Sequence, residues 1–358
     1  MLPPRRAERL VALAATTSLA LALAACGGGS TPSGSASPSG SPSPSASVGS
    51  TTRPEGPWTL VAWTVKRSDT TVEQRSARAI LGTFDPSCET GACELTLSPA
   101  GADGTYREPE APPGDGATPL TLPFTLAWKG STYEGTLPFR VGSCTNAKGE
   151  LVEKGYSTST SMSLTFVPPA ASAPARLHGT VTHVSKGTPA SRKRGCTDFT
   201  ETEAVTGVPT GSVAATAVPA GEYEGSLSTT ATTPKRLAAV GSALWLGTMT
   251  VAGDAAAPTI TGLARSTGPL TTGADGWSAA PPAGATQCRA PDGTVVDAGA
   301  DGTETFGGLH AVALTKDGKP IFAGSWRLRS NPNAKGLKAR CALAVYEGRL
   351  YLVPRGAG

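Results

Sequence analysis

Aromatic residues, histidine and methionine are scarce in this sequence of 358 residues. Phe, Trp and Tyr together make up 5% of the chain, and there are three His and three Met. This composition argues against a helical bundle, while 44 Gly and 31 Pro are typical of short strands joined by frequent turns. The sequence therefore predicts an all-β protein.

A strong net charge is also lacking. The chain has 31 Lys and Arg against 27 Asp and Glu, and residues 1–25 hold three of the Arg and one of the Glu. The remaining 333 residues thus carry 28 basic and 26 acidic side chains, a net charge of +2. A nearly neutral chain has no electrostatic footprint for nucleic acid, so we expect no nucleic-acid partner.

Long hydrophobic runs are missing as well. The longest mostly apolar run, Leu10 to Ala25, has 16 residues and is rich in Ala, which is too short for a permanent membrane-spanning helix. It follows Arg5, Arg6 and Arg9 and ends in small residues. A basic start, a short apolar stretch and small residues at the end predict a secretory signal peptide.

The end of this run, Leu23-Ala24-Ala25-Cys26, resembles the lipobox of bacterial lipoproteins. The resemblance implies that residues 1–25 are removed and that Cys26 begins the mature chain with a diacylglyceryl group on its thiol. It also implies a lipid anchor on the extracytoplasmic face of the cell membrane. The alternative is an ordinary secretory signal followed by an incidental Cys.

Downstream of Cys26, the chain divides into a tether and two β domains. Residues 26–57 are almost entirely Gly, Ser, Pro, Thr and Ala, which predicts a disordered tether. From Trp58 onward, short segments alternate between apolar and polar residues without a helical stripe. We expect two tandem antiparallel β domains, each a barrel or a sandwich, over residues 58–213 and 214–358.

Near the end, Glu347-Gly348 is expected to be the turn of a hairpin.

The two halves look like copies of one unit. Leu81-Gly82-Thr83 matches Leu246-Gly247-Thr248, and Gly179 with Cys196 matches Gly324 with Cys341 at the same separation of 17 residues. Such repeated spacing predicts an internal duplication, with extra residues in the loop Ser98–Pro119 of the first copy.

Seven cysteines occur, and six remain if Cys26 is acylated. An even number in an exported protein predicts disulfides. The separations of 52 and 53 residues in the two copies predict the bridges Cys144–Cys196 and Cys288–Cys341. Cys88 and Cys93 are left over and are expected to close a small loop, although a bridge between the copies is an alternative.

Residues for metal or nucleophilic chemistry do not gather in a motif. His178 and His183 lie on one predicted strand but point to opposite faces, and His310 is isolated, so we expect no metal site and no cofactor. We find no nucleophile elbow and no phosphate-binding loop. Close carboxylates such as Glu201 and Glu203 allow an acid and base pair, but the simpler interpretation is a solvated strand face.

A basic loop recurs before the last Cys of each copy. Because such a loop can bind an anionic wall polymer or lipid headgroup, we list six residues as candidates for an anionic partner: Arg192, Lys193, Arg194, Lys335, Lys338 and Arg340. The simpler interpretation is that these side chains only keep a turn solvated.

Two short motifs in the first copy resemble those of lipocalins. Gly56-Pro57-Trp58 is similar to the Gly-x-Trp that opens a lipocalin barrel, and Thr197-Asp198-Phe199 is similar to a later Thr-Asp-Tyr element. The second copy departs from the pattern, with Tyr223 in place of Trp. The resemblance implies a barrel that carries an apolar ligand.

The leading functional hypothesis is a membrane-tethered, non-enzymatic binding or structural module of the cell envelope. Its partners would be cell-wall polymer, lipid or another envelope protein. The alternatives are a lipocalin-like carrier of an apolar ligand and a wall-acting hydrolase that uses paired carboxylates.

Overall fold

The computed structural model describes most of the chain beyond the predicted tether. The described residues are 53–68, 77–84, 92–99, 122–145, 151–170, 173–213, 217–234, 243–292 and 294–357. The predictions for the signal peptide, for Cys26, for the tether up to residue 52 and for the bridge between Cys88 and Cys93 lie outside the described residues. The described part is almost entirely β, as the composition predicts.

The first half of the chain forms a closed antiparallel barrel, here called barrel 1. Its strands follow one another around the barrel in chain order, and the last strand pairs with the first. They are β1 (Gly56–Arg67), β2 (Ala77–Phe84), β3 (Ala92–Pro99), β4 (Leu122–Trp128), β5 (Thr132–Thr145), β6 (Leu151–Val167), β7 (Arg176–Gly187) and β8 (Phe199–Pro209).

Alternation along each strand decides what fills barrel 1. On β1, Trp58, Leu60 and Ala62 point into the barrel, while Val61 and Trp63 point outward. The ring of Trp58 packs edge-on against Phe84, and its Nε1 donates to the carbonyl of Glu55 at 3.1 Å. The apolar core also contains Leu95, Leu126, Tyr133, Met162, Leu164, Leu177, Val181 and Val205.

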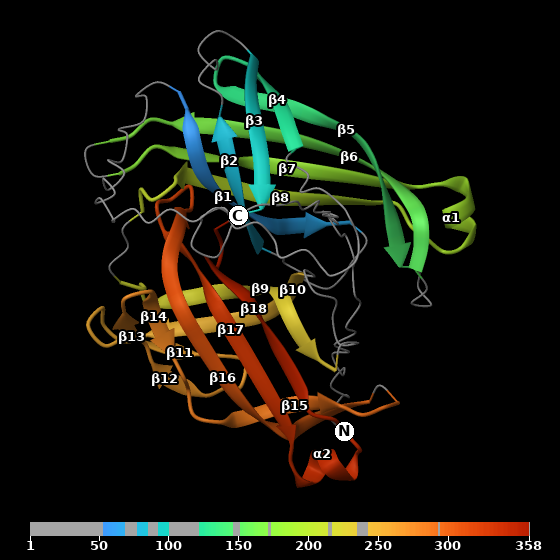
Figure 1. Cartoon of the computed structure of the whole chain (residues 1–358), viewed down its shortest axis with the longest axis vertical. Coiled ribbons are helices and arrows are strands. Elements are labelled where there is room, and N and C mark those ends of the chain that lie inside the picture. The colour runs from blue at the N-terminus through green and yellow to red at the C-terminus, as the bar shows by residue number, and fades with distance from the viewer. Residues whose placement is uncertain are drawn as a thin grey trace, which may run out of the picture.

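The second half forms a nearly closed antiparallel barrel, barrel 2, which lies below barrel 1 in Figure 1. Its core includes Tyr223, Phe306, Phe322 and Trp326. The strands are β9 (Gly221–Thr233), β10 (Ala243–Ala252), β11 (Thr259–Thr261), β12 (Thr267–Pro269), β13 (Thr271–Gly273), β14 (Gly276–Ala279), β15 (Gly284–Arg289), β16 (Val295–Leu314), β17 (Pro320–Pro332) and β18 (Ala344–Pro354).

The two barrels pack together through their outer walls. An apolar cluster, here called the inter-barrel cluster, joins β1 and β2 to β16, β17 and β18; it consists of Val61, Trp63, Ala77, Ala79, Val312, Ala313, Ile321, Ala323, Tyr351 and Val353. Four of its members are alanines, whose small side chains let the sheets approach closely. Ala77 N also donates to Ser226 Oγ of barrel 2 at 2.8 Å. Apolar burial and polar contacts therefore hold the barrels in one arrangement.

Each barrel carries the disulfide that the Cys spacing predicts. Cys144 bonds to Cys196 and Cys288 to Cys341, with Cα atoms 6.2 and 5.9 Å apart. In both barrels a helix of five residues comes shortly before the second Cys: α1 (Pro189–Lys193) and α2 (Ala334–Lys338).

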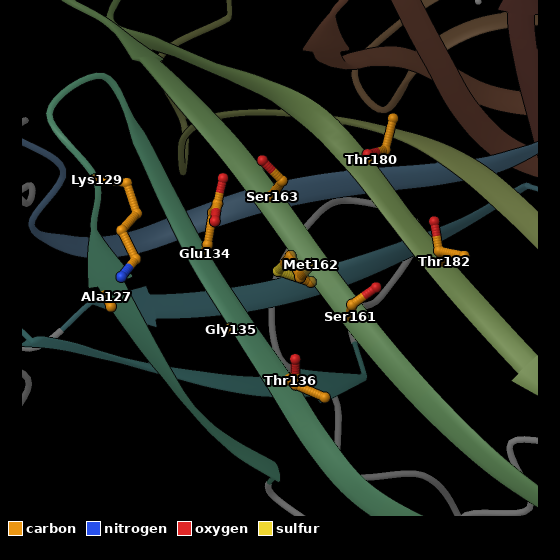
Figure 2. Close-up of a pocket in the computed structure, with 10 residues that line it drawn as sticks. All are labelled: Ala127, Lys129, Glu134, Gly135, Thr136, Ser161, Met162, Ser163, Thr180 and Thr182. Atoms are coloured by element: carbon orange, nitrogen blue, oxygen red, sulfur yellow. The ribbon is translucent and has the colours of Figure 1, made fainter.

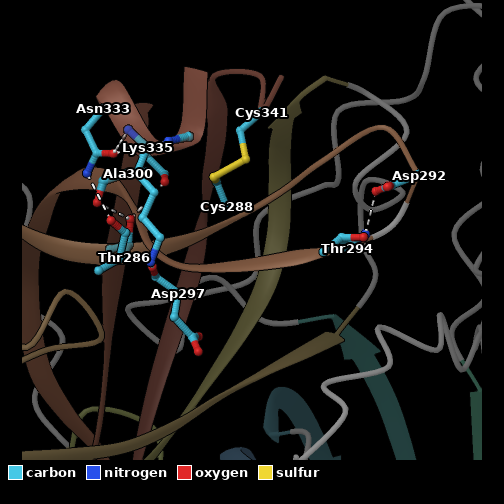
Figure 3. The surroundings of a disulfide bond; sticks show 12 residues. Thr286, Cys288, Asp292, Thr294, Asp297, Ala300, Asn333, Lys335 and Cys341 are labelled. Carbon is cyan, nitrogen blue, oxygen red and sulfur yellow. Dashed lines mark hydrogen bonds between the residues drawn. A yellow bond between two sulfur atoms is a disulfide. The ribbon is translucent and has the colours of Figure 1, made fainter. Parts of the chain in front are cut away.

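The local sequence explains how α2 places its Cys (Figure 3). Asn333 caps the helix by accepting hydrogen bonds from the backbone N–H groups of Lys335 and Gly336. A Cβ at Gly336 would lie 2.0 Å from the carbonyl oxygen of Gly299 and 3.0 Å from Cys288 Sγ. Only glycine therefore lets the helix pack this closely against β16 beside the disulfide.

One sequence-based prediction in barrel 2 is wrong. Glu347-Gly348 does not make a hairpin turn but lies within the continuous strand β18. The register between β18 and β9 shifts between these two residues, which marks a β-bulge. A Cβ at Gly348 would lie 2.1 Å from Ser228 O, so this glycine serves a close backbone approach.

The described part of the chain contains only short helices. Within it, no helix has the length and apolar character needed to cross a membrane.

We predict that replacing both Cys288 and Cys341 with Ser lowers the free energy of unfolding by about 2–5 kcal/mol, because the bridge restricts a long loop of the unfolded chain. Urea denaturation of the variant and the parent chain measures this difference. Peptide mapping without reductant provides the control, and a peptide joining Cys144 to Cys288 would contradict the two-barrel pairing.

Candidate functional site

Part of the interior of barrel 1 is polar and charged. Arg78 on β2 makes a two-pronged ion pair with Glu203 on β8, and its Nη2 lies 2.6 Å from Glu203 Oε2. On β7, His183 Nε2 lies 3.1 Å from the same carboxylate oxygen, and His183 Nδ1 lies 2.9 Å from Thr160 Oγ1 on β6. Side chains of four strands are thus linked across the interior.

A second ion pair lies two residues earlier on β8. Glu201 accepts hydrogen bonds from Thr64 Oγ1 at 2.8 Å and from Arg67 Nη1 at 3.2 Å. The guanidinium of Arg67 also lies 4.0 Å from the centre of the Phe199 ring. We call Thr64, Arg67, Arg78, Thr160, His183, Glu201 and Glu203 the cross-barrel network.

The simpler interpretation of the sequence placed Glu201 and Glu203 on a solvated strand face. The structure shows that this interpretation is wrong. Residues i and i+2 do share one side of β8, but that side is the interior, and the Glu203 side chain is only 1% exposed. Burial alone would raise the pKa of Glu203. The positive charge of Arg78 and the hydrogen bond with His183 outweigh burial and lower this pKa to about 2.

This electrostatic state limits the chemistry of the network. A general acid needs a carboxyl group that keeps its proton near neutral pH, which calls for a raised pKa. The depressed pKa of Glu203 keeps that group ionised. The geometry and the charges fit a role of Glu203 in holding Arg78 and His183 in place.

Barrel 2 has a buried carboxylate of its own. Glu304 on β16 is fully buried and accepts hydrogen bonds from Trp326 Nε1 at 2.6 Å and from the backbone N–H groups of Leu263 and Ala264 at 3.2 and 3.1 Å. It thereby holds the turn between β11 and β12 against the core, and the Ala264 side chain is buried there. Gly262 leaves the necessary space, since a Cβ there would lie 2.1 Å from Glu304 Oε2.

Histidines and acidic residues do not gather into a metal centre. Among the described residues, no group of three or more His, Cys, Asp or Glu side chains is placed to hold a metal ion. The ring of His183 belongs to the cross-barrel network, whereas His178, an odd number of residues earlier on the same strand, faces the other side. Burial, together with the charges of Arg176 and Lys316, lowers the pKa of His178.

The structure does not bring the six candidate basic residues together. Arg192, Lys193 and Arg194 lie on or beside α1, and Lys335, Lys338 and Arg340 lie on or beside α2, at distant points of the molecule in Figure 1. Several of them are already engaged; for example, Arg192 forms an ion pair with Asp198 at 2.7 Å, and Lys335 Nζ donates to Asp297 O at 2.8 Å. They form two small basic loops rather than one anionic-partner site.

The lipocalin-like motifs occupy opposite ends of barrel 1. Trp58 pairs with Pro209 at the end of β8, whereas Asp198 immediately precedes the start of β8. The Asp198 carboxylate accepts hydrogen bonds from Gly187 N and from Arg192, and both interactions lower its pKa. Trp58 therefore completes the apolar core, while Asp198 fastens the loop that carries α1.

Sequence reasoning missed a polar groove on the outer wall of barrel 1 (Figure 2). The groove has a volume of about 450 Å³ and lies over β5, β6 and β7, beside the end of β4. Its polar lining, here called the hydroxyl groove, consists of Lys129, Glu134, Thr136, Ser161, Ser163, Thr180 and Thr182. The signal for it in the sequence is the run of alternate Ser and Thr along Ser157–Thr165.

The strand register arranges these side chains in two rows. Thr136 pairs with Ser161, and Ser161 with Thr182; in the neighbouring row, Glu134 pairs with Ser163, and Ser163 with Thr180. Adjacent strands lie about 4.8 Å apart, and the rows are roughly 6.7 Å apart along each strand. The groove is therefore a regular grid of polar groups on a rigid sheet.

Comparison with known proteins gives little guidance. No family model matches the chain, and no curated protein matches it. Among solved structures, the chain is similar to a crystal structure of a protein assigned as AttH from Nitrosomonas europaea, with 10% identity over 89% of this chain and 98% of that one. The TM-score of 0.21 is too low for this likeness to inform fold or function.

We predict that Glu203→Gln destabilises the protein by about 3 kcal/mol, because it leaves the guanidinium of Arg78 without its counter-charge. This is the lower end of the range for a broken buried pair, since 34% of the Arg78 side chain is exposed. Chemical denaturation measures the change. The matched control is Glu347→Gln, which breaks the exposed pair with Arg327 and should cost less than about 1 kcal/mol. Equal effects of the two substitutions would contradict the structural role of the network.

Acid should remove the stabilisation that Glu203 provides. Its pKa falls from 4.5 to about 2 on folding, so its ionised form stabilises the protein fully above pH 4.5. That contribution is lost as the pH falls from about 4.5 towards 2. Unfolding free energies measured across this range should show the difference between the parent chain and Glu203→Gln shrinking as the pH falls. A constant difference would contradict the depressed pKa.

Proposed function

We propose that this protein is a cell-envelope lipoprotein whose two barrels serve as a non-enzymatic binding or structural module, held to the membrane by lipid on Cys26. The motif Leu23-Ala24-Ala25-Cys26 supports the anchor and, with it, a location on the extracytoplasmic face. The observation that carries the binding role is the hydroxyl groove, which lies on an exposed wall of a disulfide-linked barrel.

The contents of the barrels favour this proposal over a carrier. A carrier for an apolar ligand would use an apolar cavity inside a barrel. The interior of barrel 1 is occupied by its apolar core and by the cross-barrel network, and that of barrel 2 by its core and the turn held by Glu304. Binding is therefore expected on the outer walls.

The charges of the cross-barrel network favour a binding or structural module over a hydrolase. Glu201 and Glu203 are each paired with an arginine, and the pKa of Glu203 is depressed rather than raised. Another two close carboxylates, Glu222 and Glu224, lie on β9, where Glu222 forms an ion pair with Arg355 at 2.7 Å. The proposed partners are cell-wall polymer, lipid or another envelope protein.

We predict that Cys26→Ser abolishes membrane association of the full chain. The thiol that would carry the lipid is lost, while the upstream signal and the barrels are unchanged. Detergent-phase partitioning and labelling with radioactive fatty acid measure the effect. As a control, Cys288→Ser should still partition into detergent and incorporate the label. Retention of Cys26→Ser in the detergent phase would show that the anchor is not at this residue.

A further inference from the structure

We infer that the hydroxyl groove binds a neutral, hydroxyl-rich polysaccharide; this inference rests on the proposed envelope role and names the ligand class for it. The groove of about 450 Å³ falls within the usual volume range of small-ligand sites. Its open position on the wall of the barrel suits a segment of a long polymer, which can enter and leave along the sheet.

The hydrogen-bonding groups of the groove match those of a polyol. A Ser or Thr hydroxyl can donate one hydrogen bond and accept others, as the hydroxyl of a sugar can. Within the described residues, the side chains of Thr136, Ser161, Ser163, Thr180 and Thr182 make no hydrogen bond to another part of the chain. Their donors and acceptors are therefore available to a ligand.

The charges of the groove point to a neutral polymer. Lys129 and Glu134 contribute one charge of each sign, so the lining has no net charge to attract a polyanion. Glu134 accepts a hydrogen bond from Thr132 Oγ1 at 3.2 Å and keeps further acceptor sites for ligand hydroxyls. Figure 2 shows both charged side chains at one end of the grid of hydroxyls.

Barrel 2 offers an internal comparison. On its outer wall, Thr303 pairs with Arg329, and Thr305 pairs with Arg327, which forms an ion pair with Glu347. By the match of Gly179 with Gly324, the charged Arg327 stands where barrel 1 has Thr182. We assign polysaccharide binding to barrel 1 alone.

The test replaces hydroxyl groups with methyl groups of nearly the same shape. The variant Thr136→Val/Thr180→Val/Thr182→Val keeps β-branched side chains on the strands and removes three potential hydrogen bonds. Affinity electrophoresis of the full mature chain in gels containing dextran, mannan or galactan measures binding. We expect retardation of the parent chain by at least one of these polymers and a roughly tenfold to hundredfold weaker affinity of the variant.

The matched control is Thr303→Val/Thr305→Val on barrel 2, which should bind like the parent chain. A second variant, Ser161→Ala/Ser163→Ala, tests the same groove if the triple variant does not fold, as judged by circular dichroism. The inference is overturned if no neutral polymer retards the parent chain, if both groove variants bind as it does, or if the chain binds only poly(glycerol phosphate) or anionic vesicles. None of these results would bear on the proposed lipid anchor at Cys26, which detergent partitioning tests independently.

Discussion

The packing of the barrels through the inter-barrel cluster determines which walls of the molecule remain available. Val61 and Trp63 of barrel 1 are buried against barrel 2, and small residues such as Ala79 and Ala323 let the two sheets come close. This contact uses the outer faces of β1 and β2 and part of the outer face of β8. The groove residues Thr136, Ser161, Ser163, Thr180 and Thr182 on β5, β6 and β7 lie outside this cluster.

The same contact explains why outward-facing side chains differ so much within one barrel. On β1, alternate outward positions carry large apolar groups because the neighbouring barrel covers them. On β6, the corresponding positions carry Ser, because water or a ligand faces them. In barrel 1, β1 is therefore buried on both sides and β6 on one side. Accordingly, the outward positions are apolar on β1 and polar on β6.

The cross-barrel network replaces apolar packing in part of barrel 1. Buried ion pairs seldom stabilise a protein more than apolar side chains of the same volume would. Their geometry is more restrictive, however, because Arg78, His183 and Glu203 each have to find partners on other strands. The network therefore fixes the registers of β2, β7 and β8 relative to one another. Those strands adjoin both the inter-barrel contact and the groove.

The repeat of the disulfides shows what a sequence can predict. The pairings Cys144–Cys196 and Cys288–Cys341 followed from two nearly equal separations, and the all-β class from composition and alternation. These features depend on periodicity along the chain, which can be seen without knowing which segments meet in space. The six basic residues illustrate the limit, since their similar positions in the two copies do not bring α1 near α2.

The prediction of a solvated face for Glu201 and Glu203 was wrong for a related reason. Alternation shows that Glu201 and Glu203 share a face, but it does not show which face is the interior when uncharged residues such as Ala204 and Thr206 occupy the other one. Here the outward face of β8 meets barrel 2, where Thr206 Oγ1 donates to Leu314 O, so both sides of the strand are covered. Hydrophobic alternation is then no guide to orientation, and the register of Glu203 with Thr64 and its contact with Arg78 settle it.

The sequence predicts a turn at Glu347-Gly348 because Gly after a polar residue commonly ends a strand. The glycine is required instead by the backbone of Ser228, which approaches too closely for any Cβ. A glycine needed for a close approach and a glycine needed for a turn look alike in one sequence.

The equivalent positions of the two barrels suggest how one scaffold came to hold different interiors. Thr160 pairs with His183 in barrel 1, and Glu304 pairs with Leu328 in barrel 2, each between the strands two and one before the last. In barrel 1 the polar partners come from other strands, so the ion pairs link the walls directly. In barrel 2 the carboxylate bonds to the turn between β11 and β12 and to Trp326. Since both interiors are then occupied, a difference in ligand between the barrels would be encoded on their outer walls, where Arg327, paired with Glu347, stands in place of Thr182.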